Sequence, residues 1–301
     1  MRSVKGRSDL AMPILVNGAN GRLGSTVMQM AGPLGEAGVR RNVEQFAQST
    51  LISSDGLAPV GSLSKFVAII NCAGLISGSA SELQKANVDH ALKLAIHARE
   101  EGVQRFIQVS SFSVYGDAEQ ICCRTDTAPI TAYGRSKLAA ERELLALVTP
   151  AFTVTCVRLP FMFDTKNPGI MGSLVKALSI LPYWPTTRMP IQRSMITYTG
   201  AASLLLESIN DAPPGIIVVS DAQPFTIEML ASTLQCSDRP TAKLIAAPNW
   251  VINLVRRFLP FVGRRLFQSS NLCPSRNWAA DRAQKYGIEH EVKLIIAQGI
   301  R

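Results

Sequence analysis

Blocks of apolar residues alternate with polar segments along the first half of the chain, and their spacing predicts strands and helices in turn. Short apolar runs predict buried parallel strands at 13–16, 39–43, 50–53, 66–71 and 106–109. Apolar residues at helical spacing predict helices at 22–37, 81–101 and 131–147. The first of these should be interrupted or end near Gly32-Pro33, because proline removes a hydrogen-bond donor. Strands that alternate with helices in this way predict an α/β fold, a Rossmann-type doubly wound parallel sheet.

The pattern changes after Pro160. Residues 164–190 are rich in proline and glycine. After them, the residue pattern predicts helices at 193–210 and 226–234 and a strand at 215–220. We therefore expect a sheet domain over 13–164 and a smaller C-terminal lobe over 165–301, from which strand 215–220 would return to the main sheet. Residues 1–12 form a polar leader without periodicity, which we expect to be disordered.

The first strand runs directly into a glycine-rich turn that precedes a helix. Its glycines are spaced Gly-x-x-Gly-x-x-Gly. The first glycine would permit the tight turn, the second a close approach of the backbone to a pyrophosphate, and the third close packing of the helix on the sheet. The helix N-terminus would present N–H groups to the phosphates. The predicted dinucleotide contacts in this turn are Gly18, Asn20, Gly21, Arg22, Leu23 and Gly24.

The end of the second strand bears on the choice of cofactor, because an acidic residue there binds the ribose diol of NAD and an arginine favours the 2′-phosphate of NADP. Arg41 and Glu44 offer both chemistries, so the sequence leaves NAD and NADP open. Asp55 follows the third strand, where it would either contact the adenine edge or close a turn. Small residues follow the next strand, where the chain would pass close to the cofactor: Cys72, Ala73 and Gly74.

Two groups of residues are candidates for the chemistry. Tyr133 and Lys137 lie four positions apart in a predicted helix, so they share one face. The ammonium would stabilise the phenolate of the tyrosine and lower its pKa toward neutrality. Ser111 and Ser113 follow the strand at 106–109, where a hydroxyl would hold the reacting oxygen of a substrate beside the tyrosine. Each pattern occurs by chance, but their order on the expected elements favours a proton-transfer site.

With these motifs in place, the chain resembles the extended short-chain dehydrogenase/reductase superfamily, and within it the NAD-dependent epimerase/dehydratase family that acts on nucleotide sugars. The resemblance rests on the three glycines, on Ser111 four positions before the tyrosine of Val-Tyr-Gly, and on Tyr133 and Lys137 as the Tyr-x-x-x-Lys pair. It implies that Ser111, Tyr133 and Lys137 are catalytic. It also implies that Lys137 binds the nicotinamide ribose and that Tyr133 exchanges a proton with the sugar hydroxyl while hydride moves between sugar and nicotinamide.

The resemblance extends to residues outside these motifs. It implies that Asn87 and Pro160 contact the cofactor, that Ser111, Ser113 and Tyr133 contact the substrate, and that Arg193 meets the substrate diphosphate. The family pattern is altered at two places. Gly200 replaces an acidic position that follows the arginine, and the family's Tyr-Gly-Pro is replaced after Pro160. These departures affect the expected substrate contacts and leave the cofactor and proton-transfer residues unchanged.

Three functions remain open within this resemblance. A 4,6-dehydratase carries an acidic pair after the hydroxyl residue, whereas Phe112 and Ser113 stand there, so dehydration is disfavoured. We favour a 4-keto reductase with exchangeable NAD(P)H, acting at C4 of a UDP-(N-acetyl)hexose in surface-polysaccharide synthesis. The alternatives are a UDP-hexose 4-epimerase with tightly bound NAD and a non-catalytic NAD(P)-binding regulatory protein. The last is disfavoured because a pure binder needs no proton donor.

The net charge and the cysteine spacing limit which binding partners and metal ions are expected. The formal charge of +9 is dispersed, without a Lys/Arg run or an aromatic platform, so nucleic acid is not an expected partner. The six cysteines show neither Cys-x-x-Cys nor a metal-ligand spacing, and no metal is expected. The expected small-molecule partner is a nucleotide sugar. By resemblance only, the helices at 81–101 and 131–147 are candidates for a homodimer contact.

Apolar segments also bear on location. No apolar run reaches the roughly 18 residues that span a bilayer, and no apolar segment follows the basic residues of the N-terminus. We therefore expect a cytoplasmic protein. The amphipathic stretch at 250–267 carries four arginines and would suit an anionic membrane surface, but a lobe helix with a solvated basic face is the favoured interpretation.

Overall fold

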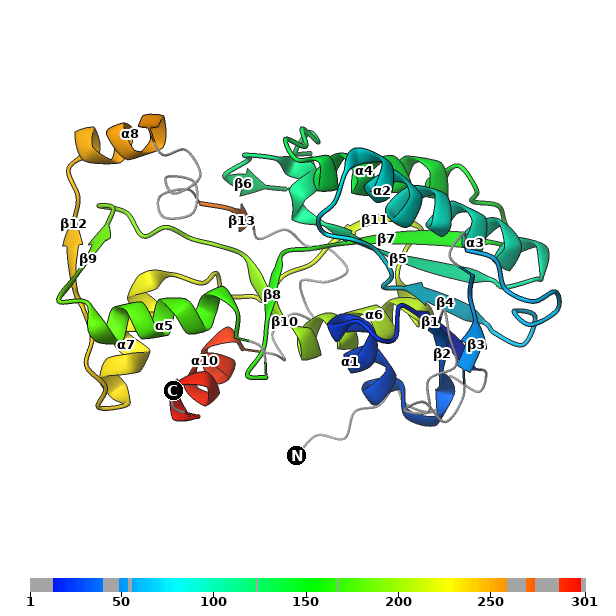
Figure 1. Ribbon diagram of the computed structural model, residues 1–301, viewed down its shortest axis with the longest axis horizontal. Coiled ribbons are helices and arrows are strands. Elements are labelled where there is room, and N and C mark those ends of the chain that lie inside the picture. The colour runs from blue at the N-terminus through cyan, green and yellow to red at the C-terminus, as the bar shows by residue number, and fades with distance from the viewer. Residues whose placement is uncertain are drawn as a thin grey trace. The chain divides into compact units, whose positions relative to one another are not determined.

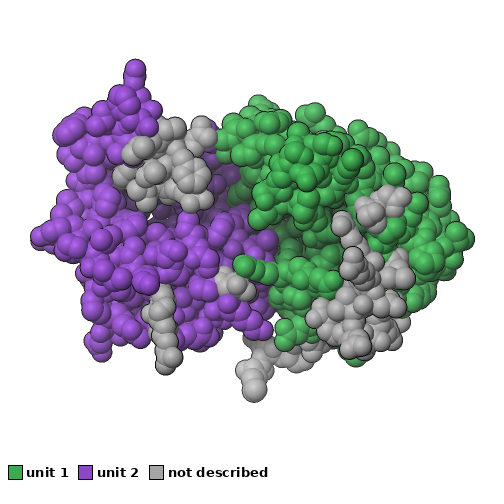
Figure 2. Space-filling view, in the orientation of Figure 1, with its two compact units in different colours: residues 1–116, 126–159, 201–218 green, residues 117–125, 160–200, 219–301 purple. Residues whose placement is uncertain are grey.

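The computed structural model describes residues 13–39, 49–53, 56–122, 124–166, 168–258, 269–273 and 287–298. The chain forms two compact units (Figure 2). Unit 1 comprises residues 1–116, 126–159 and 201–218, and unit 2 comprises residues 117–125, 160–200 and 219–301. The chain therefore passes from one unit to the other several times.

Unit 1 is built on a seven-stranded sheet in which each neighbouring pair of strands is parallel (Figure 1). The spatial order is β11-β7-β5-β4-β1-β2-β3. The strands are β1 (Ile14–Asn17), β2 (Gly35–Val39), β3 (Ser49–Leu51), β4 (Ala68–Asn71), β5 (Arg105–Ser111), β7 (Thr153–Leu159) and β11 (Gly215–Val218). The strand order reverses between β1 and β4, and ligands bind at the carboxyl ends of strands beside such a reversal. The predicted doubly wound parallel sheet is confirmed.

Helices cover both faces of this sheet. They are α1 (Arg22–Ala31), α2 (Ala80–Gln84), α3 (His90–Glu100), α4 (Ala132–Leu145) and α6 (Tyr198–Asp211). Figure 1 shows α2, α3 and α4 on one side and α1 and α6 on the other. Leu15, Ile69, Phe106 and Val154 form one register row across four strands, and this row packs in a buried core with residues of α3 and α4. Because successive side chains along a strand point to opposite faces of the sheet, the residues before and after each member of this row face the opposite side.

The second strand lies earlier in the chain than predicted. The helix expected at 22–37 ends at Ala31, next to the break expected near Gly32-Pro33, and a 3₁₀ turn follows at Gly32–Leu34. The strand occupies Gly35–Val39 instead of 39–43. Glycines are depleted in strands, which is why the pattern failed to indicate one here. Pairing with β1 holds this segment extended, and Gly38 lies so close that an added Cβ would be 3.0 Å from the Cα of Asn17.

The long helix predicted at 81–101 is confirmed in position but is interrupted. A capping box formed by Ser79 and Glu82 begins α2, and a π-helical turn at Lys85–Asp89 separates α2 from α3. Turns of this kind occur frequently at functional sites. The predicted helix at 131–147 is confirmed as α4, and the strand predicted at 106–109 extends to Ser111 as β5.

Unit 2 surrounds a second hydrophobic core. Three helices contribute to it, namely α5 (Ile170–Ile180), α7 (Ile227–Cys236) and α10 (Ile288–Ala297). Three two-stranded parallel pairs are β8 (Phe161–Phe163) with β10 (Met195–Thr197), β9 (Tyr183–Thr186) with β12 (Lys243–Ala246), and β6 (Gln120–Ile121) with β13 (Asn271–Leu272). The helix α5 lies in the Pro/Gly-rich stretch, where none was predicted, and α8 (Asn249–Phe258) follows β12. Over the described ranges, no helix combines the length and the apolarity that crossing a membrane requires.

Candidate active site

The structure brings Ser111 and Tyr133 together in unit 1. The strand β5 ends at Ser111, whose Oγ accepts the backbone N–H of Ser113 at 3.2 Å. Thr131 caps α4 by accepting the N–H of Gly134 at 2.9 Å, which sets Tyr133 in the first turn of that helix. The hydroxyl of Ser111 lies close enough to that of Tyr133 to favour the phenolate of the tyrosine. Gly134 permits this approach, because a Cβ at that position would clash with the carbonyl oxygen of Ser113.

Lys137 lies one turn along the same helix and is buried. Its Nζ donates to the carbonyl oxygen of Val109 at 3.1 Å and lies 5.9 Å from the ring centroid of Tyr133. Burial lowers the pKa of Lys137 to about 8, although the charges of Cys72 and Glu141 oppose this shift. Burial also raises the pKa of Tyr133, and the hydrogen bond from Ser111 only partly offsets it. The predicted lowering of the tyrosine pKa is therefore wrong in direction, because loss of hydration penalises the phenolate more strongly.

A row of buried amides connects the sheet to the acceptor of Lys137. Asn17, Asn71 and Gln108 are register partners on β1, β4 and β5, and their side chains are joined by two hydrogen bonds of 2.8 Å. Gln108 donates to the carbonyl oxygen of Val109 at 2.9 Å, the same oxygen that accepts from Lys137. Sequence analysis missed this row. An amide at the same register position of three apolar strands is the signal that could have revealed it.

The glycine-rich turn is packed tightly against the loop that follows β4. Gly18 has a φ of +81°, and a Cβ there would lie 2.6 Å from the backbone nitrogen of Ala73. A Cβ at Gly24 would clash with the carbonyl oxygen of Gly18. Gly21 is the N-cap of α1 and offers no side-chain acceptor to the first helical N–H groups, which suits an anionic ligand. This cradle fits the pyrophosphate of a dinucleotide.

Asn87 links the loop after β4 to the helix that carries Tyr133. Its Oδ1 accepts the N–H of Leu75 at 2.8 Å, and its Nδ2 donates to the Leu75 carbonyl oxygen and to the Ser136 hydroxyl. Ser136 in turn donates to the carbonyl oxygen of Tyr133 at 2.8 Å. A Cβ at Gly74 would lie 2.7 Å from the Asn87 Oδ1, so this glycine keeps the loop close to Asn87. The contacts of Asn87 are those of a residue that positions its neighbours.

The remaining predicted site residues are distributed as follows. Asn20 and Arg22 are exposed beside the turn and Leu23 is buried, whereas Cys72 and Ala73 lie in the loop after β4. Ser113 has a buried hydroxyl without a hydrogen-bond partner among the described residues. Pro160 and Arg193 belong to unit 2, where the backbone of Arg193 pairs with Phe225. The segments that hold Arg41, Glu44 and Asp55 lie outside the described residues.

Sequence analysis also missed a buried ion pair beneath α4. Arg158 on β7 donates to both carboxylate oxygens of Glu141 on α4, at 2.7 and 3.0 Å, and to the hydroxyl of Tyr115 at 2.9 Å. Burial lowers the pKa of Arg158, but the hydrogen bonds and charge of Glu141 outweigh burial and leave the pKa above its ordinary value. A charged residue inside the apolar pattern of β7 is the signal for such a pair.

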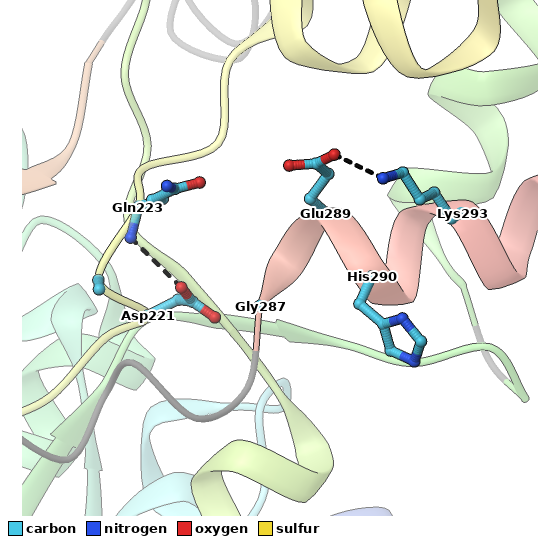
Figure 3. A pocket seen from close by; sticks show the side chains of 7 residues that line it. Asp221, Gln223, Gly287, Glu289, His290 and Lys293 are labelled. Atoms are coloured by element: carbon cyan, nitrogen blue, oxygen red, sulfur yellow. Dashed lines mark hydrogen bonds and ion pairs between the residues drawn. The ribbon is translucent and has the colours of Figure 1, made fainter. Parts of the chain in front are cut away.

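A pocket of about 550 Å³ lies in unit 2 between the segment after β11 and the start of α10 (Figure 3). Its wall includes Asp221, whose Oδ2 accepts the N–H of Ile288 at the helix N-terminus at 3.2 Å, and Glu289, which pairs with Lys293 at 2.7 Å. Burial raises the pKa of Asp221. These charges serve α10, and no sequence motif indicated the pocket. Among the described residues, no group of three or more His, Cys, Asp or Glu side chains is arranged to hold a metal ion.

Substitution of Gly18 tests the cradle. Gly18→Ala should abolish dinucleotide retention and lower the free energy of unfolding by at least about 2 kcal/mol more than Gly61→Ala does, because its Cβ must displace the backbone at Ala73. Gly61 has a similar φ of +78° with no heavy atom within 4 Å of an added Cβ, so Gly61→Ala carries only the backbone strain, about 1 kcal/mol. Urea unfolding and bound-nucleotide content measure both effects. Equal losses in the two variants would refute the steric argument.

Comparison with known proteins places this geometry in a family. The sequence pattern described as "NAD dependent epimerase/dehydratase family" matches residues 14–169, which contain the glycine turn, Ser111, Tyr133 and Lys137. A UDP-glucose 4-epimerase of Vibrio cholerae is 29% identical over 182 residues, and the alignment covers 57% of this chain and 55% of that enzyme. The matched region thus spans about half of that relative's length.

Solved structures share the fold over nearly the whole chain. The UDP-N-acetylglucosamine 4-epimerase of Bacillus cereus matches with a TM-score of 0.73 at 14% identity and covers 96% of this chain and 99% of its own. The UDP-glucuronic acid 4-epimerase of Bacillus cereus, solved with NAD, matches with a TM-score of 0.71 at 13% identity and covers 96% and 100%. At these identities the match concerns the fold. The family match covers more than half of the chain and contains the glycine turn and the Ser111, Tyr133 and Lys137 group, and the chain therefore belongs to the NAD-dependent epimerase/dehydratase family.

Proposed function

We propose that this protein is an NAD-dependent 4-epimerase of a UDP-hexose or UDP-N-acetylhexose. The observation that carries the proposal is the approach of the Ser111 hydroxyl to that of Tyr133 beside the buried ammonium of Lys137, at the carboxyl edge of a sheet with a dinucleotide cradle. The Vibrio cholerae relative, a UDP-glucose 4-epimerase, supports the reaction type and the UDP-linked substrate. Family membership supports NAD as the cofactor.

Each residue of the site has a distinct role in this proposal. The glycine turn holds the pyrophosphate of NAD, and Lys137 holds the nicotinamide ribose. When bound, NAD would supply the hydride acceptor for oxidation at the sugar C4 and the hydride donor for reduction from the opposite face of the 4-keto sugar. Ser111 donates a hydrogen bond to the sugar O4 and orients it, and Tyr133 takes the proton from that hydroxyl and later returns it. The hydroxyl of Ser113, which has no partner among the described residues, is available to a second sugar oxygen. The family resemblance assigns the diphosphate to Arg193.

A 4-keto reductase is the second candidate, and one observation favours it. Burial raises the pKa of Tyr133, so the phenol is protonated at neutral pH, which is the form that donates a proton to a new alkoxide. The reductase would use the same residues as the epimerase. The two differ in whether the dinucleotide must exchange during each turnover.

Incubation with a pure UDP-sugar, without added nucleotide, tests the proposal. We expect proton NMR to show a UDP-hexose or UDP-N-acetylhexose converting to its C4 epimer until both are present at equilibrium. A protein that leaves these sugars unchanged, but reduces a UDP-4-keto sugar when NADH or NADPH is supplied, would be the reductase. Inertness in both assays would contradict both candidates.

The pH dependence of epimerisation follows from the two pKa shifts. The pair loses its first proton near pH 8, because the pKa of Lys137 is about 8 and that of Tyr133 is higher. The phenolate–ammonium form that takes the sugar proton is a tautomer of the one-proton state that results, so its population rises with pH up to this point. We expect kcat/KM to rise about tenfold per pH unit below pH 8 and to level off above it. Lys137→Arg should move the break upward, because a guanidinium stays charged. A rate that falls as the pH rises through 8 would contradict the phenolate role.

A further inference from the structure

The helix α8 in unit 2 leaves most of its apolar face uncovered. At 100° per residue, Trp250, Leu254 and Phe258 lie within 80° of one another on the helix surface. These three side chains are 68%, 51% and 68% exposed, whereas Ile252 on the far edge of the apolar arc is 6% exposed. The helix therefore rests on the protein by one edge. The helix carries the exposed Arg257 that a solvated basic face requires, but it exposes apolar side chains as well, and residues 259–267 of the stretch lie outside the described residues.

The segments of unit 2 that precede α8 also expose large apolar side chains. Figure 1 shows α8 following directly after β12, and the N–H of Ala247 between them donates to the carbonyl oxygen of Thr186 on β9 at 2.8 Å. The strand pair β9 and β12 also exposes Tyr183 and Ile245. Large exposed apolar side chains concentrated on one helix and the strands that lead into it are typical of an interaction surface.

The charge of this region identifies the class of partner. The sequence contains no Asp or Glu between Asp238 and Asp281, and α8 itself carries the arginine pair at 256–257. Arg257 is exposed and lies 20° from Trp250 around the helix, at the border of the apolar arc. A helix with Trp, Leu and Phe on one face and arginine at its border suits the interface of an anionic bilayer, where the rings enter the headgroup region and the guanidinium meets phosphates.

We propose that α8 attaches the protein to the surface of an anionic phospholipid membrane as a peripheral contact. The apolar arc enters the headgroup region, and the basic residues provide attraction that depends on lipid charge and on salt. A second copy of the chain is a poorer occupant, because two α8 helices that pack together would bring like-charged arginines such as Arg257 near each other. The contact uses no residue of the proposed catalytic group. It would therefore place the enzyme at the membrane surface without changing the reaction that it catalyses.

Sedimentation of the full-length protein with vesicles tests this proposal. We expect strong binding to an equimolar mixture of phosphatidylcholine and phosphatidylglycerol, weak binding to phosphatidylcholine alone, and release at high salt. The double variant Trp250→Ala/Phe258→Ala should bind at least about tenfold more weakly. Arg257→Gln should bind about fivefold more weakly. Lys93→Gln, which removes the same charge from an exposed site on α3, and Val60→Ala, at a 97% exposed apolar site in unit 1, should bind as the wild type does.

Tryptophan emission gives a readout that a structural defect would not reproduce. Anionic vesicles should shift the emission to shorter wavelength, and Trp250→Phe should remove most of this shift while the protein still sediments with vesicles. All variants should retain the epimerisation or reduction rate of the wild type, which shows that they fold. Equal binding to neutral and anionic vesicles, unchanged binding of the α8 variants, or an α8-dependent dimer in the absence of lipid would overturn the proposal.

Discussion

Tyr133→Phe should lower kcat about 100-fold to 10,000-fold, because it removes the group that exchanges a proton with the sugar hydroxyl. The ring keeps its volume, and the variant loses only the hydroxyl that faces Ser111. We therefore expect normal stability, and retention of the bound dinucleotide. Initial rates of sugar conversion, together with nucleotide content and thermal unfolding, distinguish this loss of chemistry from a loss of structure.

Tyr183→Phe is the matched control, because Tyr183 is an exposed tyrosine on β9 in unit 2. It should convert the sugar at the rate of the wild type. A Tyr133→Phe variant that retains full activity would remove Tyr133 from the mechanism. If it also left the biological role of the protein intact, the non-catalytic NAD(P)-binding alternative would be favoured.

Arg158→Met should lower the free energy of unfolding by about 3 to 5 kcal/mol, because it leaves the carboxylate of Glu141 buried without its partner. Glu141 is 2% exposed and accepts two hydrogen bonds from Arg158. Urea unfolding measures the effect.

Two further variants separate the ion pair from simple packing. Glu141→Leu/Arg158→Met removes both charges, and it should recover much of the stability that Arg158→Met loses. Lys293→Met breaks the half-exposed pair with Glu289 and should change the free energy of unfolding by less than about 1 kcal/mol. If Arg158→Met and Lys293→Met were equally mild, the Glu141 carboxylate would not depend on Arg158.

Local sequence signals predicted the parts of the site that lie close together in the chain. The turn that contains Gly18, Gly21 and Gly24 could be located from the sequence because a strand, a tight turn and a helix N-terminus are all encoded within a few residues. The shared helix face of Tyr133 and Lys137 could be predicted because residues four positions apart on a helix are neighbours. The approach of Ser111 to Tyr133 was expected only through the order of the elements, and it depends on Gly134, whose small size no local pattern indicated.

Features that depend on pairing between distant segments could not be predicted in the same way. The strand at Gly35–Val39 exists because β1 pairs with it, so its own composition gave no signal. The amide row and the Glu141–Arg158 pair join residues on different strands and helices, and their partners become evident only once the sheet order is known. The direction of the Tyr133 pKa also depends on burial, which spacing alone does not reveal. The choice between epimerase and reductase depends on cofactor exchange, which no motif encodes.

The most direct test of the proposed epimerase is the identity of the nucleotide released when freshly purified protein is denatured. An epimerase never needs to release its cofactor, so we predict about one equivalent of NAD per chain, carried through purification. A protein that emerges empty and then binds NADH or NADPH reversibly would favour the 4-keto reductase. A protein that neither carries nor binds a dinucleotide would contradict the central claim that Gly18, Gly21 and Gly24 form a dinucleotide-binding cradle.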